Sequence, residues 1–154
     1  MQATITRVGV VVPALIALCR TSLPSWQVLD GPRAAQELAD DILVVGTGNA
    51  DTAEAYSSEL DVQAGLTERL QERIAVHCEI STWNGDQDNG VPTLRSKLVT
   101  ALGVLDGAFR ADQHLAGTCD RVYLGGAPAR WYVLQSPAGP GMGVEFDVTV
   151  LAWI

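Results

Sequence analysis

The strongest constraint on the fold is a period-two alternation of larger apolar side chains with small or polar ones, which starts at Ile74 in a segment that runs out to Trp83. The apolar positions are Ile74, Val76, Cys78 and Ile80, and Ala75, His77, Glu79 and Ser81 lie between them. Successive side chains of a β-strand point to opposite faces, so a period of two predicts a strand with one buried face. His77 and Glu79 then share the face opposite Cys78, which we expect to meet solvent or a partner.

Two other segments have helical periodicity. In residues 91–111 the apolar side chains recur every three or four positions, which is typical of a helix with one buried face. They are Leu94, Leu98, Leu102, Leu105 and Phe109. Residues 8–19 carry no charge and are too few to cross a bilayer. We expect them to form a buried helix that ends before Pro24, with Pro13 near the first turn, where a missing N–H is tolerated.

Four further segments have the character of strands. They are residues 26–30, 42–46, 121–135 and 144–154, the third of them interrupted by Gly-Gly-Ala-Pro at 125–128. Consecutive strands joined by short turns favour antiparallel pairing, with the helices covering one face. A chain of 154 residues suits one domain. We predict a single α+β domain over residues 1–154, with a mostly antiparallel sheet of about five strands and two main helices on one face. Around residues 47–72 we expect a protruding loop or hairpin.

Charge restricts the class of partner. The formal net charge is −8, from 18 acidic and 10 basic residues. A dedicated nucleic-acid binder needs a basic surface that neutralises phosphates, so this balance argues against one. Residues 30–61 hold eight carboxylates and only Arg33 as a cation, and so carry −7 of the total. Some surface formed by this segment must be strongly acidic.

Three sequence patterns resemble parts of chemical sites without completing them. Gly-Thr-Gly-Asn-Ala-Asp at 46–51 has Asp51 where a dinucleotide-binding loop needs its third glycine. His77-Cys78-Glu79 begins like a zinc deaminase, but the required Pro-Cys-x-x-Cys is absent. The carboxylates of residues 30–61 match no calcium-loop spacing. We therefore expect no catalytic residues, no cofactor and no metal ion.

The chain has three cysteines, Cys19, Cys78 and Cys119. An odd number with no Cys-x-x-Cys pair favours reduced, mostly buried thiols over disulfides or a zinc site. An alternative class stays open, in which the protein is a small cytosolic enzyme or ligand-binding domain that uses Cys119 or His114 in a pocket.

Aromatic residues gather near the expected strand ends. Trp131 and Tyr132 are adjacent on one strand, so one of the two must face away from the core. Trp83 and Trp153 lie close to strand ends. Such residues are enriched in protein interfaces, although they also close the ends of cores.

Several features along nearly the whole chain resemble one family. Leu-Asp-Gly-Pro at 29–32 closes the first strand, and Trp-Asn-Gly-Asp at 83–86 leads into the helix that contains Arg95. Ala-Asp-Gln-His-Leu-Ala-Gly at 111–117 precedes a strand, and the sequence finishes Val-Thr-Val-Leu-Ala-Trp-Ile at 148–154. In this order of elements the chain resembles the tail terminator (tail completion, head–tail joining) proteins of long-tailed bacteriophages.

The resemblance implies a structural virion protein. It would form a homo-oligomeric ring, usually a hexamer, that caps the tail tube, ends tube polymerisation and provides the head-docking surface. The implied partners are further copies of the chain, the tail tube protein and the head-neck connector protein, with no membrane. DNA would pass through the ring without specific binding. The implied location is the neck end of the virion tail, assembled in the host cytoplasm. The alternative in this class is another neck or minor tail component, such as a head-closure or tube-like protein.

Two sets of candidate residues follow from this interpretation. The expected interface residues are Trp83, Asp86, Arg95, Trp131 and Tyr132. The acidic residues expected to line the lumen or a subunit seam are Asp40, Asp41, Asp51, Glu54, Glu59 and Asp61. A ring needs two different complementary patches on each subunit, because its interfaces are heterologous.

Overall fold

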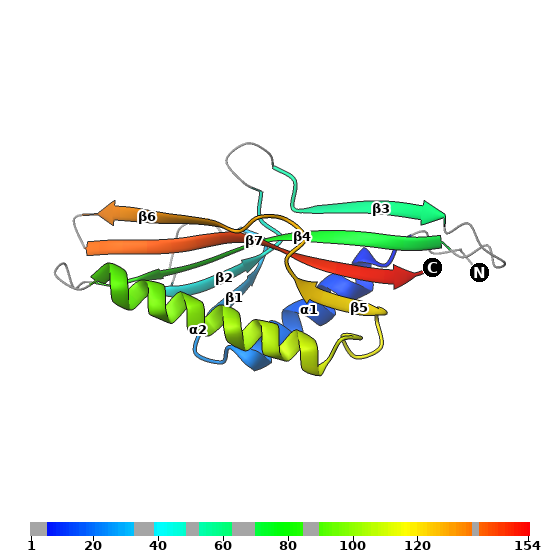
Figure 1. Cartoon of the computed structure of the whole chain (residues 1–154), viewed down its shortest axis with the longest axis horizontal. Helices are drawn as coiled ribbons and strands as arrows, with labels where there is room; N and C mark the ends of the chain where they lie inside the picture. The colour runs from blue at the N-terminus through cyan, green and yellow to red at the C-terminus, as the bar shows by residue number, and fades with distance from the viewer. Residues whose placement is uncertain (1–5, 33–38, 49–52, 63–69, 85–89, 137–138) are drawn as a thin grey trace.

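The structure is a computed structural model that describes residues 6–32, 39–48, 53–62, 70–84, 90–136 and 139–154 (Figure 1). Its elements, in chain order, are α1 (Val8–Ser22), β1 (Gln27–Asp30), β2 (Asp41–Val45), β3 (Tyr56–Val62), β4 (Leu70–Trp83), α2 (Gly90–Ala111), β5 (Arg121–Leu124), β6 (Arg130–Ser136) and β7 (Gly139–Trp153). The predicted α+β class and both predicted helices are confirmed.

The two longest strands, β4 and β7, form the centre of a seven-stranded sheet. They run antiparallel over their whole length, from Gln71 opposite Trp153 to Trp83 opposite Gly141. On the side away from β7, β4 pairs with β3 along its first half and with β2 along its second half. On the side away from β4, β7 pairs with β6 along its first half and with β5 along its second half. The sheet therefore has two ends that carry different edge strands (Figure 1).

The alternation in β4 separates the two faces of this sheet as predicted. Ile74, Val76, Cys78 and Ile80 are buried and lie opposite Val150, Val148, Phe146 and Val144 of β7, which are buried too. These side chains belong to one hydrophobic core with the buried faces of α1 and α2. Both helices therefore cover the same face of the sheet, which we call the helix face; the other is the open face (Figure 1).

The sheet is mixed and has seven strands, whereas the sequence predicted about five in mostly antiparallel order. Two causes account for the number. The segment expected to be one broken strand over 121–135 is two strands, β5 and β6, separated by a turn with positive φ at Gly125 and Gly126. A further strand, β3, lies within the segment expected to be a loop or hairpin, and pairs with β4 from Leu70 to Val76.

One pair of strands departs from antiparallel order. β1 and β2 pair in parallel, with Gln27 opposite Ile42 and Asp30 opposite Val45. A tight turn cannot join parallel strands, because the chain must return to the same end before the next strand begins. The ten residues between Asp30 and Asp41 make that return. The strand predicted to end at Asp30 does end there, but the expectation of antiparallel pairing is wrong for β1 and β2.

The position of Pro13 also differs from the prediction. Helix α1 begins at Val8, so Pro13 lies inside it, in the second turn instead of the first. Proline has no N–H to donate to the carbonyl four residues earlier, which here belongs to Gly9. Both residues are exposed, so water can satisfy that carbonyl.

A buried carboxylate fixes the start of α1 to the sheet. Glu72 of β4 is fully buried, and the hydroxyls of Thr6 and Ser58 each donate a 2.5 Å hydrogen bond to its Oε1. The backbone N–H of Arg7 donates to its Oε2 at 2.6 Å. A negative charge at a helix N-terminus is favourable, and three donors compensate for the lost hydration. This contact holds α1 against the β3 end of the sheet.

Candidate functional site

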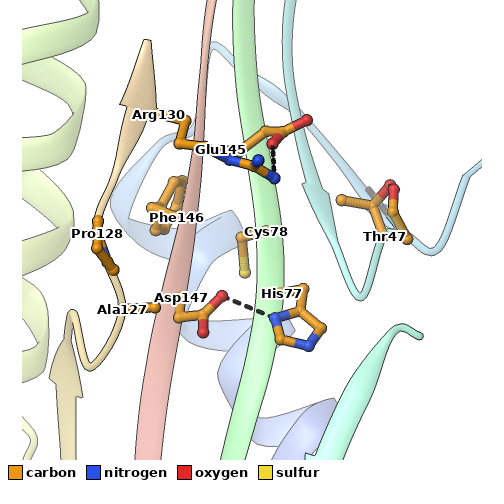
Figure 2. A pocket seen from close by; sticks show the side chains of 10 residues that line it. Thr47, His77, Cys78, Ala127, Pro128, Arg130, Glu145, Phe146 and Asp147 are labelled. Atoms are coloured by element: carbon orange, nitrogen blue, oxygen red, sulfur yellow. Dashed lines mark hydrogen bonds and ion pairs between the residues drawn. The ribbon is translucent and has the colours of Figure 1, made fainter. Parts of the chain in front are cut away.

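The open face has a hollow of about 350 Å³ over the middle of β4 and β7. Polar residues of both strands and of two adjoining loops line it. Thr47, His77, Arg130, Glu145 and Asp147 are among them, and Figure 2 shows them from close by. Glu145 and Asp147 are alternate residues of β7, and His77 is the partner of Asp147 in β4, so one face of the sheet presents all three.

His77 lies between two carboxylates. Its Nδ1 is 2.7 Å from Oδ1 of Asp147, and its Nε2 is 3.4 Å from Oε1 of Glu54 (Figure 2 draws the first contact). Burial alone lowers the pKa of His77, but hydrogen bonds and charge from Asp147 and Glu54 outweigh it, so the pKa is raised. Both ring nitrogens face acceptors, which favours the doubly protonated cation. Both nitrogens of the ring are therefore engaged by carboxylates of the same subunit, an arrangement unlike that of a free general base.

Two more polar pairs extend along the same face. The guanidinium of Arg130 in β6 lies 2.9 Å from the carboxylate of Glu145 in β7 (Figure 2). Tyr132 forms a side-chain hydrogen bond with Glu79, and this contact, after burial, raises the tyrosine pKa. The open face therefore presents charges that are largely compensated within the subunit.

At the β6 end, aromatic rings cover glycines of β7. A Cβ on Gly141 would lie 2.6 Å from the ring of Trp83, and a Cβ on Gly143 would lie 2.2 Å from the hydroxyl oxygen of Tyr132. Trp83 and Tyr132 come from the strands on either side, β4 and β6. The two glycines leave space for both rings to lie flat across β7. The sequence shows the aromatic residues but gives no sign that glycines accommodate them.

Strand β6 is exposed on both of its faces. Trp131 is 44% exposed, Val133 49% and Leu134 43%. Trp131 and Val133 pair with Val144 and Met142 and thus point to the helix face, whereas Leu134 points to the open face. Within the described residues only β7 pairs with β6, so its outer edge carries no strand. Trp131 and Tyr132 were predicted as interface residues from the sequence, whereas Val133 and Leu134 were not, although the predicted strand over 121–135 contained both.

The other predicted interface residues are spread over the molecule. Trp83 ends β4 beside β6 and is 36% exposed, in line with an interface at this end. Arg95 is exposed on α2, on the far side of the sheet from the hollow. Asp86 lies outside the described residues.

The predicted acidic group divides between the two faces. Asp41 starts β2 on the helix face, accepts a hydrogen bond from Thr82 and pairs with Lys97 of α2 at 2.6 Å. Asp40 is exposed just before it. Glu54 faces His77, and Glu59 of β3 is exposed opposite Arg73 on the open face. Asp51 and the side chain of Asp61 lie outside what the structure describes. Glu54 and Glu59 are thus the members of the group placed on the open face.

The cysteines are all free and buried, as predicted. Burial raises the pKa of Cys19 to about 12. Burial, and next the charge of Asp120, raise the pKa of Cys119 to about 11. Because the thiolate is the reactive form, neither group is prepared for nucleophilic attack at neutral pH.

The described residues also bear on metal ions and membranes. In these ranges no three His, Cys, Asp or Glu side chains are arranged to hold a metal ion. None of the helices described is both long and apolar enough to cross a membrane.

A second hollow lies between the end of α1 and the middle of α2. It measures about 810 Å³, and its lining includes Trp26, Ser96 and Lys97. The ammonium of Lys97 lies 5.8 Å from the centre of the Trp26 ring while it pairs with Asp41. The one cation of this hollow is therefore already held by the chain's own residues.

No protein-family model matches the chain, and no curated protein matches it either. The assignment of a function therefore depends on the geometry above and on the resemblance described from the sequence.

Proposed function

We propose that the protein is a structural component of a bacteriophage tail, which forms a ring of identical copies that caps the tail tube and provides the surface for head docking. The observation that carries this proposal is the outer edge of β6. It is a seven-residue sheet edge with apolar side chains exposed on both faces. Such an edge is a template for pairing with another chain, and proteins that remain single usually protect it with charge, proline or a cover.

The charges of the open face fit the passage of DNA through such a ring. Of its carboxylates, Glu54 and Asp147 face His77, Glu145 pairs with Arg130, Glu59 lies opposite Arg73, and Glu79 bonds to Tyr132 of the same subunit. A face of this kind has no excess of positive charge to hold phosphates, so DNA could pass along it without binding tightly.

The alternative of a cysteine-dependent enzyme receives less support. Cys119 is 8% exposed, its pKa is raised, and its thiol donates to the Gln113 carbonyl at 3.5 Å. His114 is exposed beyond the end of α2. The alternative within the structural class is another neck or minor tail component, which would use the same edge to pair with a different protein.

The test combines native mass spectrometry with negative-stain microscopy, on the purified chain alone and after mixing with tail tubes assembled from the tube protein of the same genome. We expect rings of one size, or single subunits that become rings on tube ends and stop tube growth. Single subunits that neither form rings nor bind tube ends would overturn the proposal. Rings or subunits attached elsewhere along the neck would favour the alternative component.

Two matched variants connect this test to β6. Val133→Asp places a charge on the exposed β6 edge, and Val99→Asp places one on the exposed side of α2, where the side chain is 56% exposed. Both positions are open to solvent, so both variants should keep the stability of the parent protein. We expect Val133→Asp to abolish ring formation and Val99→Asp to retain it. Equal behaviour of the two would show that β6 is not the contact.

A further inference from the structure

We infer, building on the proposed function, that neighbouring copies join by pairing the outer edge of β6 in one copy with the outer edge of β3 in the next. The register sets Arg130 opposite Glu59. The open faces and the helix faces would then each continue from one subunit to the next as one surface.

The lengths and surroundings of the edges select these two strands. In the described part of the chain, β1, β3, β5 and β6 each pair on one side only. β1 and β5 have four residues each, and the guanidinium of Arg20 reaches across to the Val28 carbonyl of β1 at 3.3 Å. β3 and β6 have seven residues each. With Arg130 opposite Glu59, residues 130–133 of β6 pair with residues 56–59 of β3.

The strand directions agree with this pairing. β3 runs antiparallel to β4, whereas β6 runs parallel to β4, because both are antiparallel partners of β7. Copies that are arranged around a ring share one orientation along the ring axis. The β6 strand of one copy and the β3 strand of the next therefore meet antiparallel, which is the slightly more stable ladder.

Matching side-chain faces allow only registers that differ by two residues, and among these we place Arg130 opposite Glu59 because their charges are opposite. Arg130 and Tyr132 point to the open face, as do Glu59 and Ser57. With Arg130 opposite Glu59, Tyr132 lies opposite Ser57, so every pair keeps its side chains on matching faces. A shift by one residue would turn apolar side chains to the wrong face. Opposite charges directly across a ladder are favourable.

On the helix face the same register brings exposed apolar groups together. Trp131 would lie opposite Ser58 and diagonal to Leu60, and Val133 would lie opposite Tyr56. Leu60 is 48% exposed in the subunit, close to the values for Trp131 and Val133. A diagonal neighbour on an antiparallel ladder is within reach of an aromatic side chain. The contact would therefore cover the exposed apolar side chains that both edges present on the helix face.

The register also predicts a tilt. Glu59 is level with Arg73 of β4, whereas Arg130 is level with Glu145 and hence with Glu79, six residues further along β4. Each interface thus adds a stagger of about 20 Å. Because every interface shifts the next subunit in the same direction along the strands, the ring can close only if the strands are tilted relative to its axis. Four strands lie side by side between the two edges of each subunit. A shift of this size over their combined width corresponds to a strand tilt of about 45°, which is close to the strand tilt in closed barrels.

Pairing of β6 with β6 of a second copy is the competing arrangement. If Val133 of one copy lay opposite Val133 of the other, apolar side chains would meet and no like charges would face each other. The product would be a closed dimer, however, and β3 would stay exposed. A dimer of this kind could not extend into a ring.

Disulfide trapping distinguishes the arrangements, because the three native thiols are buried. We would oxidise the full-length double variant Ser57→Cys/Tyr132→Cys and analyse it on non-reducing gels beside micrographs. Directly opposite residues on neighbouring strands have Cβ atoms close enough for a disulfide. We expect a ladder of covalent oligomers that ends at the ring size. The matched control Ser57→Cys/Val133→Cys places the thiols on opposite faces and should give no ladder.

Each result has a separate meaning. Rings without a ladder in the Ser57→Cys/Tyr132→Cys variant would overturn the pairing and leave the proposed function standing. Single subunits under all conditions, including added tubes, would overturn the proposed function and the pairing with it. A covalent dimer of Val133→Cys alone would show the β6–β6 arrangement in place of the one proposed. A reconstruction with strands parallel to the ring axis would also contradict the register.

Discussion

The two faces of β4 and β7 are made by alternate residues of the same strands, yet they are built on different principles. On the helix face the side chains are apolar, and Ile74, Val76 and Ile80 have no exposed surface. On the open face the same strands present His77, Glu79 and Asp147, which are only half-buried. The first face obtains its stability from area removed from water, and the second from compensated charges that contribute little individually. A sheet of this kind can change its exposed surface at small cost to folding.

The largest expected effect tests the helix face. Ile74→Ala removes a fully buried side chain between β4 and the helices and should lower the free energy of unfolding by about 2–5 kcal/mol. The neighbouring Arg73→Ala on the exposed side should change it by about 0.5 kcal/mol or less. Urea titration of both variants measures the difference. Similar losses in the two would show that the faces do not differ as described.

An intermediate effect is expected where the open face is crowded. Gly143→Ala would bring a Cβ to 2.2 Å from the Tyr132 hydroxyl oxygen, so the ring must move. Overpacking of this kind costs about 1–3 kcal/mol. In a Tyr132→Ala background the same change should cost clearly less, because the ring is absent. A double-mutant cycle from urea titrations gives the coupling, and additive losses would contradict the contact.

The smallest expected effect tests the charges of the open face. The pKa of His77 is raised in the folded protein, so its contribution to stability is present below its unfolded pKa near 6.5 and is lost as the pH rises through the folded value. We expect this contribution to be about 0.5 kcal/mol, as for other exposed ion pairs. His77→Gln should remove that part of the pH dependence, which urea midpoints between pH 5 and 9 would measure. An unchanged pH profile would show that Asp147 and Glu54 do not stabilise the charged ring.

The sequence predicted the elements with strong periodicity. Residues 74–83 and 91–111 carry a local pattern set by burial on one face, and both became the expected strand and helix within a few residues. The apolar strand at 42–46 was also found, as β2. Local patterns succeed here because each element contacts the core through its own side chains.

Features that depend on distant residues were not predicted. The polar strand β3 has no apolar alternation, and it is a strand because β4 offers it a partner edge. The parallel register of β1 depends on the return of the chain between residues 30 and 41. The contacts of His77 join residues 23 and 70 positions apart, so no local spacing marks them. Glu72 lay in the segment expected to protrude, although it is fully buried.

The position of the two chain ends has a practical consequence. Thr6 and Arg7 are bound to Glu72 near the start of β4, and the backbone of Ile154 donates to the Leu70 carbonyl at 3.0 Å. The first described residues and Ile154 therefore lie about 40 Å along β4 from Trp83. A small fluorescent or gold label fused at either terminus would mark the same pole of the subunit, at the end that carries β3 and away from the subunit's own β6. In micrographs of labelled particles, that label would report the polarity of the subunit relative to the tube.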